Sequence, residues 1–182
     1  MEPSVANQVI LITGGARSGK SKYAEQRASE LGGRRLYIAT AEAKDDEMAR
    51  RIAEHRKRRG EQWTTVEEPI QLAETLLAWR GRTDCALLDC LTLWLSNLLI
   101  GHDDKHVEEK IDQLVQTLPQ LNFHVIFVSN EVGWGIVPDN SLARQFRDLA
   151  GWANQRIAAL ANEVVLTAAG IPIIVKQGTA CS

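Results

Sequence analysis

A glycine-rich segment near the amino terminus constrains this chain more than any other feature. Residues 14–21 read Gly-Gly-Ala-Arg-Ser-Gly-Lys-Ser, which fits G-x-x-x-x-G-K-[ST], and they lie between an apolar run, 9–12, and a helix-like stretch, 21–28. In such loops the glycines let successive backbone N–H groups face the phosphates of a nucleotide, the lysine reaches the β- and γ-phosphate oxygens, and the last hydroxyl binds Mg²⁺. The segment predicts a nucleoside triphosphate site with Lys20 on the phosphates and Ser21 on the metal. A glycine-rich turn with a surface lysine is the alternative.

Short apolar runs alternate with amphipathic stretches along the rest of the chain. Strands alternating with helices favour βαβ units, and hence an α/β fold with a mainly parallel central sheet flanked by helices. The last two strands are close enough to form a hairpin at one sheet edge. A length of 182 residues predicts one domain, 1–182. The expected strands are 9–13, 35–40, 63–67, 86–89, 125–129, 164–167 and 171–176, and the expected helices after the glycine-rich segment are 21–28, 45–59, 70–79, 91–100, 107–118 and 142–161.

Composition and charge limit the classes of partner. The formal net charge is −2 with 24% charged residues, which does not favour nucleic acid or an anionic membrane as the main partner. The longest apolar stretch, 91–100, is about half the length that spans a bilayer, and residues 1–8 lack the regions of a signal peptide. We therefore expect a cytoplasmic protein without stable membrane insertion. Three cysteines without C-x-x-C spacing predict neither disulfides nor a zinc site, and Cys85 and Cys90 are expected in the core.

Acidic residues follow several of the expected strands, at the sheet edge where ligands of parallel sheets bind. Asp89 ends the run 86–88, which is how the acidic partner of a phosphate loop is placed, near Mg²⁺ or its waters; alternatively it caps the next helix. Glu67 and Glu68 could accept hydrogen bonds from the N1–H and 2-amino groups of guanine, or form only a polar turn. Residues 130–131, Asn-Glu, follow a further strand at the same edge.

The second unusual feature is a histidine within a strongly basic segment. Residues 51–59 read Arg-Ile-Ala-Glu-His-Arg-Lys-Arg-Arg, so five cations and one anion surround His55 and give a formal local charge of +4. Neighbouring cations disfavour imidazolium, which leaves neutral imidazole as a nucleophile or base, and the same cations could bind a polyphosphate. Alternatively this is a solvated basic helix end with His55 incidental. His102 and His106, spaced i and i+4, could hold a metal, but a solvated loop is the preferred interpretation.

Taken together, these segments resemble the bifunctional adenosylcobinamide kinases/adenosylcobinamide-phosphate guanylyltransferases of cobalamin biosynthesis. The phosphate loop is shared by many enzymes, whereas the histidine-centred basic helix and the segment NEVGWGIVP are much more specific to this family. The resemblance covers nearly the whole chain. The segments that carry it are 14–21, 37–41, 45–48, 51–52, 55–56, 130–138, 142–144, 146–148, Gly151 and 154–155.

The resemblance implies two reactions. A nucleoside triphosphate phosphorylates the hydroxyl of the aminopropanol arm of adenosylcobinamide, and GTP then donates GMP to that phosphate through a guanylylated His55, releasing pyrophosphate. It also implies a RecA-like P-loop NTPase fold, GTP or ATP with Mg²⁺, catalytic roles for Lys20 and His55, and a homo-oligomer, with a trimer as the first expectation. Because family members vary between Asp and Glu where Asp89 stands, a metal role for Asp89 is left open. The nucleotide contacts that it implies are Gly14, Gly15, Ala16, Arg17, Ser18, Gly19, Lys20, Ser21, Ala39, Thr40, Ala41, Arg56, Lys57, Arg58, Arg59, Glu67 and Asp89.

Two other functions are compatible with the phosphate loop. A different small-metabolite kinase would use Lys20 and Asp89 but give His55 no covalent role, and a non-catalytic nucleotide switch would instead dock a protein partner. The histidine in the basic helix separates these readings, because neither alternative needs a nucleophile there. Trp134 and Ile136 could contact the corrin or a neighbouring subunit. Self-association is also expected because the apolar residues of 93–94 and 98–100, with Trp134, exceed what one small sheet can bury.

Overall fold

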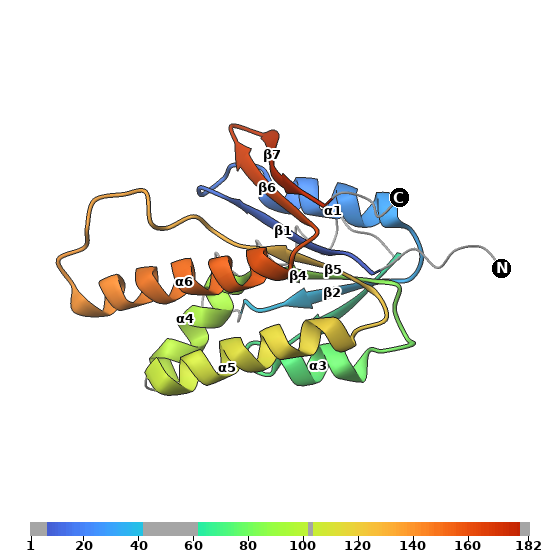
Figure 1. Ribbon diagram of the computed structural model, residues 1–182, viewed down its shortest axis with the longest axis horizontal. Coiled ribbons are helices and arrows are strands. Elements are labelled where there is room, and N and C mark those ends of the chain that lie inside the picture. Colours follow the sequence, from blue (N-terminus) through green and yellow to red (C-terminus); the bar gives the residue numbers. More distant parts are fainter. Residues whose placement is uncertain (1–6, 42–61, 102–103, 179–182) are drawn as a thin grey trace.

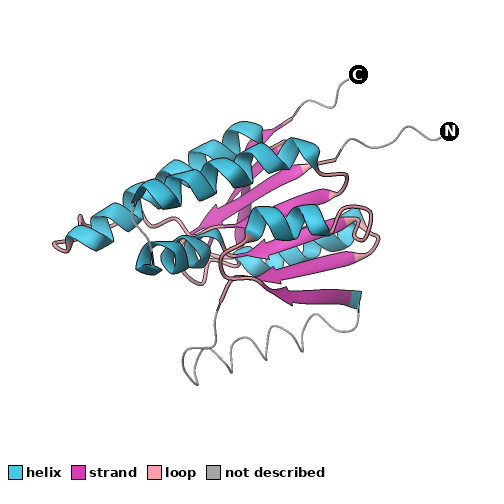
Figure 2. Cartoon of the chain, turned by 90° about the horizontal axis from the view of Figure 1, so that it is seen from below, coloured by secondary structure: helices cyan, strands magenta, loops and turns pink. Residues whose placement is uncertain are grey.

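The computed structural model describes residues 7–41, 62–101 and 104–178, and in this part of the chain a seven-stranded sheet is flanked by helices on both faces (Figures 1 and 2). The strands are β1 (Val9–Gly14), β2 (Arg35–Ala39), β3 (Trp63–Glu67), β4 (Cys85–Asp89), β5 (His124–Val128), β6 (Glu163–Ala168) and β7 (Ile171–Gln177). The helices are α1 (Lys20–Leu31), α3 (Leu72–Ala78), α4 (Leu91–Gly101), α5 (Asp104–Thr117) and α6 (Ser141–Leu160), with a 3-10 turn η2 (Leu118–Gln120).

The strand order fixes where a ligand can meet several loops at once. The order is β3-β2-β4-β5-β1-β6-β7, and every neighbouring pair is parallel except β6 and β7, which form an antiparallel hairpin. The mainly parallel sheet and the carboxyl-terminal hairpin are thus confirmed. β5 lies between β1, which leads into the glycine-rich segment, and β4, which ends in Asp89. The loops that follow these three strands therefore meet at one edge of the sheet.

Side chains along each strand alternate between two cores. In β4, Ala86 and Leu88 pack in the cluster that includes α3, α4, α5 and α6, whereas Cys85 and Leu87 pack in the cluster that includes α1. This arrangement explains why the strands read as continuous apolar runs, since both faces of the sheet are covered. Cys85 and Cys90 are both buried, as expected.

Large apolar side chains of α4 are buried in the core of this chain. Trp94 and Leu98 are 1% and 0% exposed, because α4 packs against the sheet, α5 and α6. The expectation that they are surplus apolar surface is therefore wrong for these two residues. Ile100 and Trp134 do remain exposed, at 72% and 76%.

Most element ends agree with the sequence pattern to within one or two residues, and two differ by three: α1 ends at Leu31 rather than at Ala28, and α5 begins early. α5 begins at Asp104 rather than at Val107, so His106 lies in a helix and not in a loop; acidic residues in a first turn favour such an early start. Among the described residues, no three or more His, Cys, Asp or Glu side chains are grouped so that they could hold a metal ion. No helix in the described ranges has the length and apolar character to cross a membrane. His102 and the expected helix 45–59, which contains His55, lie outside the described residues.

Candidate nucleotide-binding site

The glycine-rich segment connects β1 directly to α1, as the sequence predicts. α1 begins at Lys20, and Gly19 before it has a left-handed backbone with φ 97°. Lys20 is 7% exposed, and its Nζ donates a hydrogen bond to the Gly15 carbonyl oxygen at 2.6 Å and lies 3.5 Å from Ser18 Oγ. The ammonium group is thus held over the loop. Together with the N–H groups at the start of α1 it provides a site for an anion.

The carboxyl-terminal hairpin supports this loop from the side of β6. The hydroxyl oxygens of Ser18 and Thr167 lie 2.7 Å apart in the buried interior, and the Gly170 N–H donates to the Ser18 carbonyl oxygen at 2.9 Å. A Cβ on Gly14, whose φ is 148°, would overlap the Thr167 carbonyl oxygen, so this position requires glycine. Neither Thr167 nor Gly170 is marked as a site residue by the sequence pattern. The one sequence signal for such a role was the polar residue Thr167 near the end of an apolar strand.

Asp89 lies two strands away from the glycine-rich loop, at the carboxyl end of β4. The Tyr37 hydroxyl donates to Asp89 Oδ2 at 3.0 Å. Within the described residues this is the only hydrogen bond that the carboxylate makes, so the alternative of a helix cap finds no support in its contacts. Tyr37 therefore orients Asp89 and leaves Oδ1 for a metal ion or a water molecule. Tyr37 belongs to the segment 37–41 that carries the resemblance, but its residue type alone predicts no role beyond that of an ordinary strand residue.

The segment Ala39-Thr40-Ala41 reaches the same edge, but the Thr40 side chain binds the backbone of Cys90 instead of facing the site. Its hydroxyl donates to the Cys90 carbonyl oxygen and accepts from the Cys90 N–H, both at 2.8 Å, and Thr40 is fully buried. Asn97 Nδ2 donates to the Thr40 carbonyl oxygen at 2.8 Å. Thr40 thus joins the ends of β2 and β4, and its hydroxyl is not free for a nucleotide.

The two glutamates after β3 differ in their availability. Glu68 Oε1 accepts hydrogen bonds from the N–H groups of Ile70 and Gln71, at 2.9 and 2.6 Å, and so orders the turn that leads into α3. Glu67, the last residue of β3, is exposed. Of this pair, Glu67 is therefore the one that can accept hydrogen bonds from a base, whereas Glu68 has a structural role.

Cys85, Cys90 and His124 offer no nucleophile at this edge. Burial raises the pKa of the Cys85 thiol to about 12, and burial also raises the pKa of Cys90, so both stay protonated. His124 begins β5 at the opposite edge, where its Nδ1 accepts the Gln8 N–H at 3.0 Å and burial lowers its pKa. The expected carrier, His55, and Arg56, Lys57, Arg58 and Arg59 lie outside the described residues.

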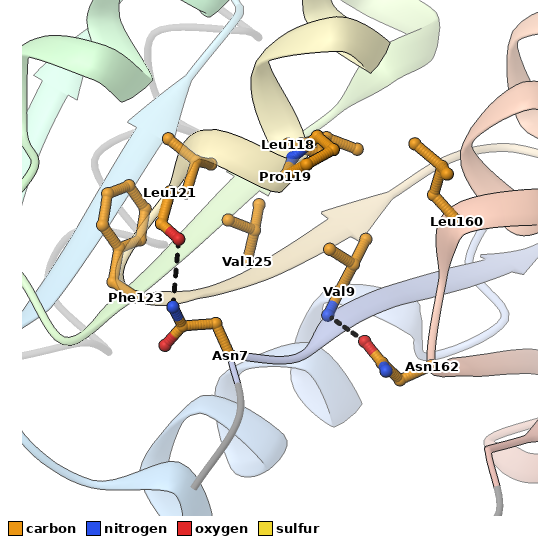
Figure 3. Close-up of a pocket in the computed structure, with 9 residues that line it drawn as sticks. All are labelled: Asn7, Val9, Leu118, Pro119, Leu121, Phe123, Val125, Leu160 and Asn162. Carbon is orange, nitrogen blue, oxygen red and sulfur yellow. Dashed lines mark hydrogen bonds between the residues drawn. The ribbon is translucent and has the colours of Figure 1, made fainter. Parts of the chain in front are cut away.

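A cavity of about 360 Å³ opens near the amino ends of β1 and β5, away from the glycine-rich loop (Figure 3). Its two amide side chains already serve the backbone: Asn7 Nδ2 donates to the Leu121 carbonyl oxygen at 3.0 Å, and Asn162 Oδ1 accepts the Val9 N–H at 2.8 Å. The remaining lining residues are apolar. The cavity lacks groups that would bind phosphate, so it is a poor candidate for the nucleotide site.

Comparison with known sequences places the whole described site within one family match. The family model for "cobinamide kinase / cobinamide phosphate guanyltransferase" matches residues 10–175. The "bifunctional adenosylcobalamin biosynthesis protein CobP" of Pseudomonas aeruginosa is 49% identical over 166 residues, which cover 91% of this chain and 96% of that protein. The "bifunctional adenosylcobalamin biosynthesis protein CobU" of Escherichia coli is 43% identical over 181 residues, covering 92% and 99%.

Solved structures with a similar fold are much more distant in sequence. The RadB recombinase is 12% identical with a TM-score of 0.51, covering 87% of this chain and 73% of that chain. An ATPase from a type III secretion system is 12% identical with a TM-score of 0.56, covering 87% and 50%. At this identity the likeness concerns the fold alone, and it confirms the P-loop fold, with its helix-flanked and mainly parallel sheet, that the resemblance implies.

Proposed function

We propose that this chain, which belongs to the cobinamide kinase/cobinamide phosphate guanyltransferase family, catalyses two consecutive reactions at the phosphate loop. Membership of that family makes it a bifunctional enzyme of cobalamin biosynthesis. In the first, a nucleoside triphosphate phosphorylates the aminopropanol hydroxyl of adenosylcobinamide. In the second, GMP passes from GTP through His55 to that phosphate, giving adenosylcobinamide-GDP and pyrophosphate. The observation that carries the proposal is the phosphate loop, with Lys20 held over it and Asp89 at the same sheet edge, in a chain that the family matches from residue 10 to residue 175.

Both reactions develop negative charge on phosphates beside Lys20. In the kinase reaction the bond to the β–γ bridging oxygen breaks, and in the transferase reaction the bond to the α–β bridging oxygen breaks. The Lys20 ammonium and the N–H groups of residues 15–21 would stabilise that charge in both transition states. Hydroxyl and carboxylate oxygens are the ligands that Mg²⁺ prefers, so Ser21 and the open Oδ1 of Asp89 fit this ion, directly or through water. Bound there, Mg²⁺ would neutralise charge on the phosphate oxygens.

His55 is the proposed carrier of GMP, by its position in the family resemblance. Neutral imidazole attacks the α-phosphorus of GTP, so that a P–N bond forms while pyrophosphate leaves. An oxygen of adenosylcobinamide phosphate then attacks the same phosphorus, the P–N bond breaks and His55 is restored. The cations of 56–59 would attract the triphosphate and keep the imidazole neutral. Sequence alone supports this assignment, because residues 42–61 lie outside the described part of the chain.

Product analysis with the purified protein tests the function. With adenosylcobinamide, Mg²⁺ and ATP or GTP, we expect adenosylcobinamide phosphate; with GTP as second substrate, adenosylcobinamide-GDP and pyrophosphate should appear in equal amounts. ATP should not replace GTP in the second step, and Glu67→Gln should weaken this preference if Glu67 accepts from guanine. A plain kinase would stop at the phosphate. A switch would bind nucleotide and form neither product.

We also propose that the protein forms a homo-oligomer, with a trimer as the first expectation. β7 is an edge strand whose residues are all exposed, and Ile171 and Val175 are each 64% exposed. An exposed apolar edge strand is a surface on which a second protein chain can pack. Sedimentation at working concentration should give a mass above 20.2 kDa. A single species at the mass of one chain would contradict the proposal.

A further inference from the structure

The chain leaving β5 runs between the phosphate loop and Asp89. β5 pairs with β1 on one side and with β4 on the other, so with strands about 4.8 Å apart its end lies about 5 Å from the end of either neighbour. The Glu131 N–H donates to the Gly14 carbonyl oxygen at 3.0 Å. Glu131 is therefore joined directly to the first glycine of the phosphate loop.

The same backbone is also held from the side of α4. Asn130 Nδ2 donates to Thr92 Oγ1 at 3.1 Å, and the Thr92 hydroxyl lies 3.1 Å from Cys90 Sγ. The Asn130 side chain is thus engaged with α4. The half-buried carboxylate of Glu131, by contrast, has no hydrogen-bond partner within the described part of the chain. A carboxylate without a partner, on a backbone that is fixed to the phosphate loop, suits proton transfer.

The other described carboxylates that follow strands at this edge are engaged or distant. Asp89 accepts from Tyr37 through Oδ2 and its Oδ1 is assigned to Mg²⁺, whereas Glu68 binds the backbone of the turn before α3. Glu67 ends β3, which lies four strand spacings from β1, or about 19 Å. Among the described strand-end carboxylates, Glu131 alone combines an open side chain with a direct link to the phosphate loop.

We infer that Glu131 is the general base of the kinase reaction, an inference that rests on the proposed function. As the substrate hydroxyl oxygen attacks the γ-phosphorus, the new O–P bond forms and the bond to the β–γ bridging oxygen breaks. The hydroxyl proton goes to the Glu131 carboxylate, the nucleoside diphosphate leaves, and the proton then passes to water. GMP transfer needs no such base, because the attacking phosphate oxygen already carries negative charge.

The two reactions therefore respond differently to Glu131→Gln, which keeps the shape of the side chain and removes its basicity. We expect kcat for phosphorylation of adenosylcobinamide to fall by about 10²–10⁴-fold, with KM for the nucleotide little changed. Labelling of the protein by α-labelled GTP, and GMP transfer to supplied adenosylcobinamide phosphate, should stay within about 2-fold of wild type. The kcat of Glu131→Asp for phosphorylation should lie between those of the wild type and of Glu131→Gln. Asp139→Asn, which removes a charge from an exposed position in the same loop, is the matched control and should retain both reactions.

Retained guanylylation shows that the variant is folded. A Glu131→Gln protein that phosphorylates at the wild-type rate overturns the inference alone, and so does one that loses both reactions equally, because the side chain would then only support the loop. A wild-type protein that forms neither product overturns the proposed function together with the inference.

Discussion

GTP labelled at the α-phosphate is expected to leave radioactivity on the wild-type protein after denaturation, and none on His55→Ala. The label should be acid-labile and base-stable, as a phosphoramidate is and a serine phosphoester is not. GTP labelled at the γ-phosphate should leave nothing, because pyrophosphate is released when the P–N bond forms. Guanylyl transfer by His55→Ala should fall by on the order of 10³-fold or more, since removing a covalent nucleophile abolishes the intermediate itself.

The kinase activity of His55→Ala should survive in part, because phosphorylation needs the phosphate loop and an incoming hydroxyl but no bond to histidine. His106→Ala is the control: His106 lies in α5, outside the basic segment, and this variant should label like wild type. If His55→Ala still forms the labelled adduct, the carrier is another residue. The basic segment would then be a phosphate clamp without covalent chemistry.

Lys20→Ala should lower both reactions, by about 10²–10³-fold or more, because it removes a positive charge from the phosphates in each transition state. Lys20 is held over the loop by the Gly15 carbonyl oxygen, so its loss removes a charge that is already positioned. Lys22→Ala, two residues further along α1 and exposed, removes the same charge away from the loop and should leave both rates unchanged. This prediction is tested by the steady-state rates of both variants in each reaction, with folding checked by circular dichroism. Unchanged turnover in Lys20→Ala would contradict the assignment of the phosphate loop.

The elements of the fold could be predicted from the sequence because a parallel strand covered on both faces appears as an apolar run. β3 was expected at 63–67 and is found there, and the hairpin of β6 and β7 was expected from their short connection. The phosphate loop was equally accessible, since its pattern is local. Which strands are neighbours is not local information. The sequence pattern therefore did not show that β5 separates β1 from β4.

The contacts that decide individual roles depend on that strand order. Glu67 and Glu68 are adjacent in sequence, and only the hydrogen bonds of Glu68 to the turn before α3 distinguish them. Tyr37 became a site residue because β2 and β4 are neighbours, which places its hydroxyl on Asp89. The burial of Trp94 likewise follows from packing between layers and not from the sequence of α4. His55, in contrast, is still known through sequence alone.

The contact between Ser18 and Thr167 has a consequence for how the protein is made. The two residues are 149 positions apart, so a ribosome exposes the phosphate loop long before it translates the strand that supports it. A nascent chain carries the full G-x-x-x-x-G-K-[ST] sequence while the Gly170 N–H and the Thr167 hydroxyl are still missing from its side. Contacts this distant along the chain form late in folding, because the entropy of closing a long loop must first be overcome. The support that the hairpin gives to the phosphate loop is therefore completed only after 149 further positions have been synthesised.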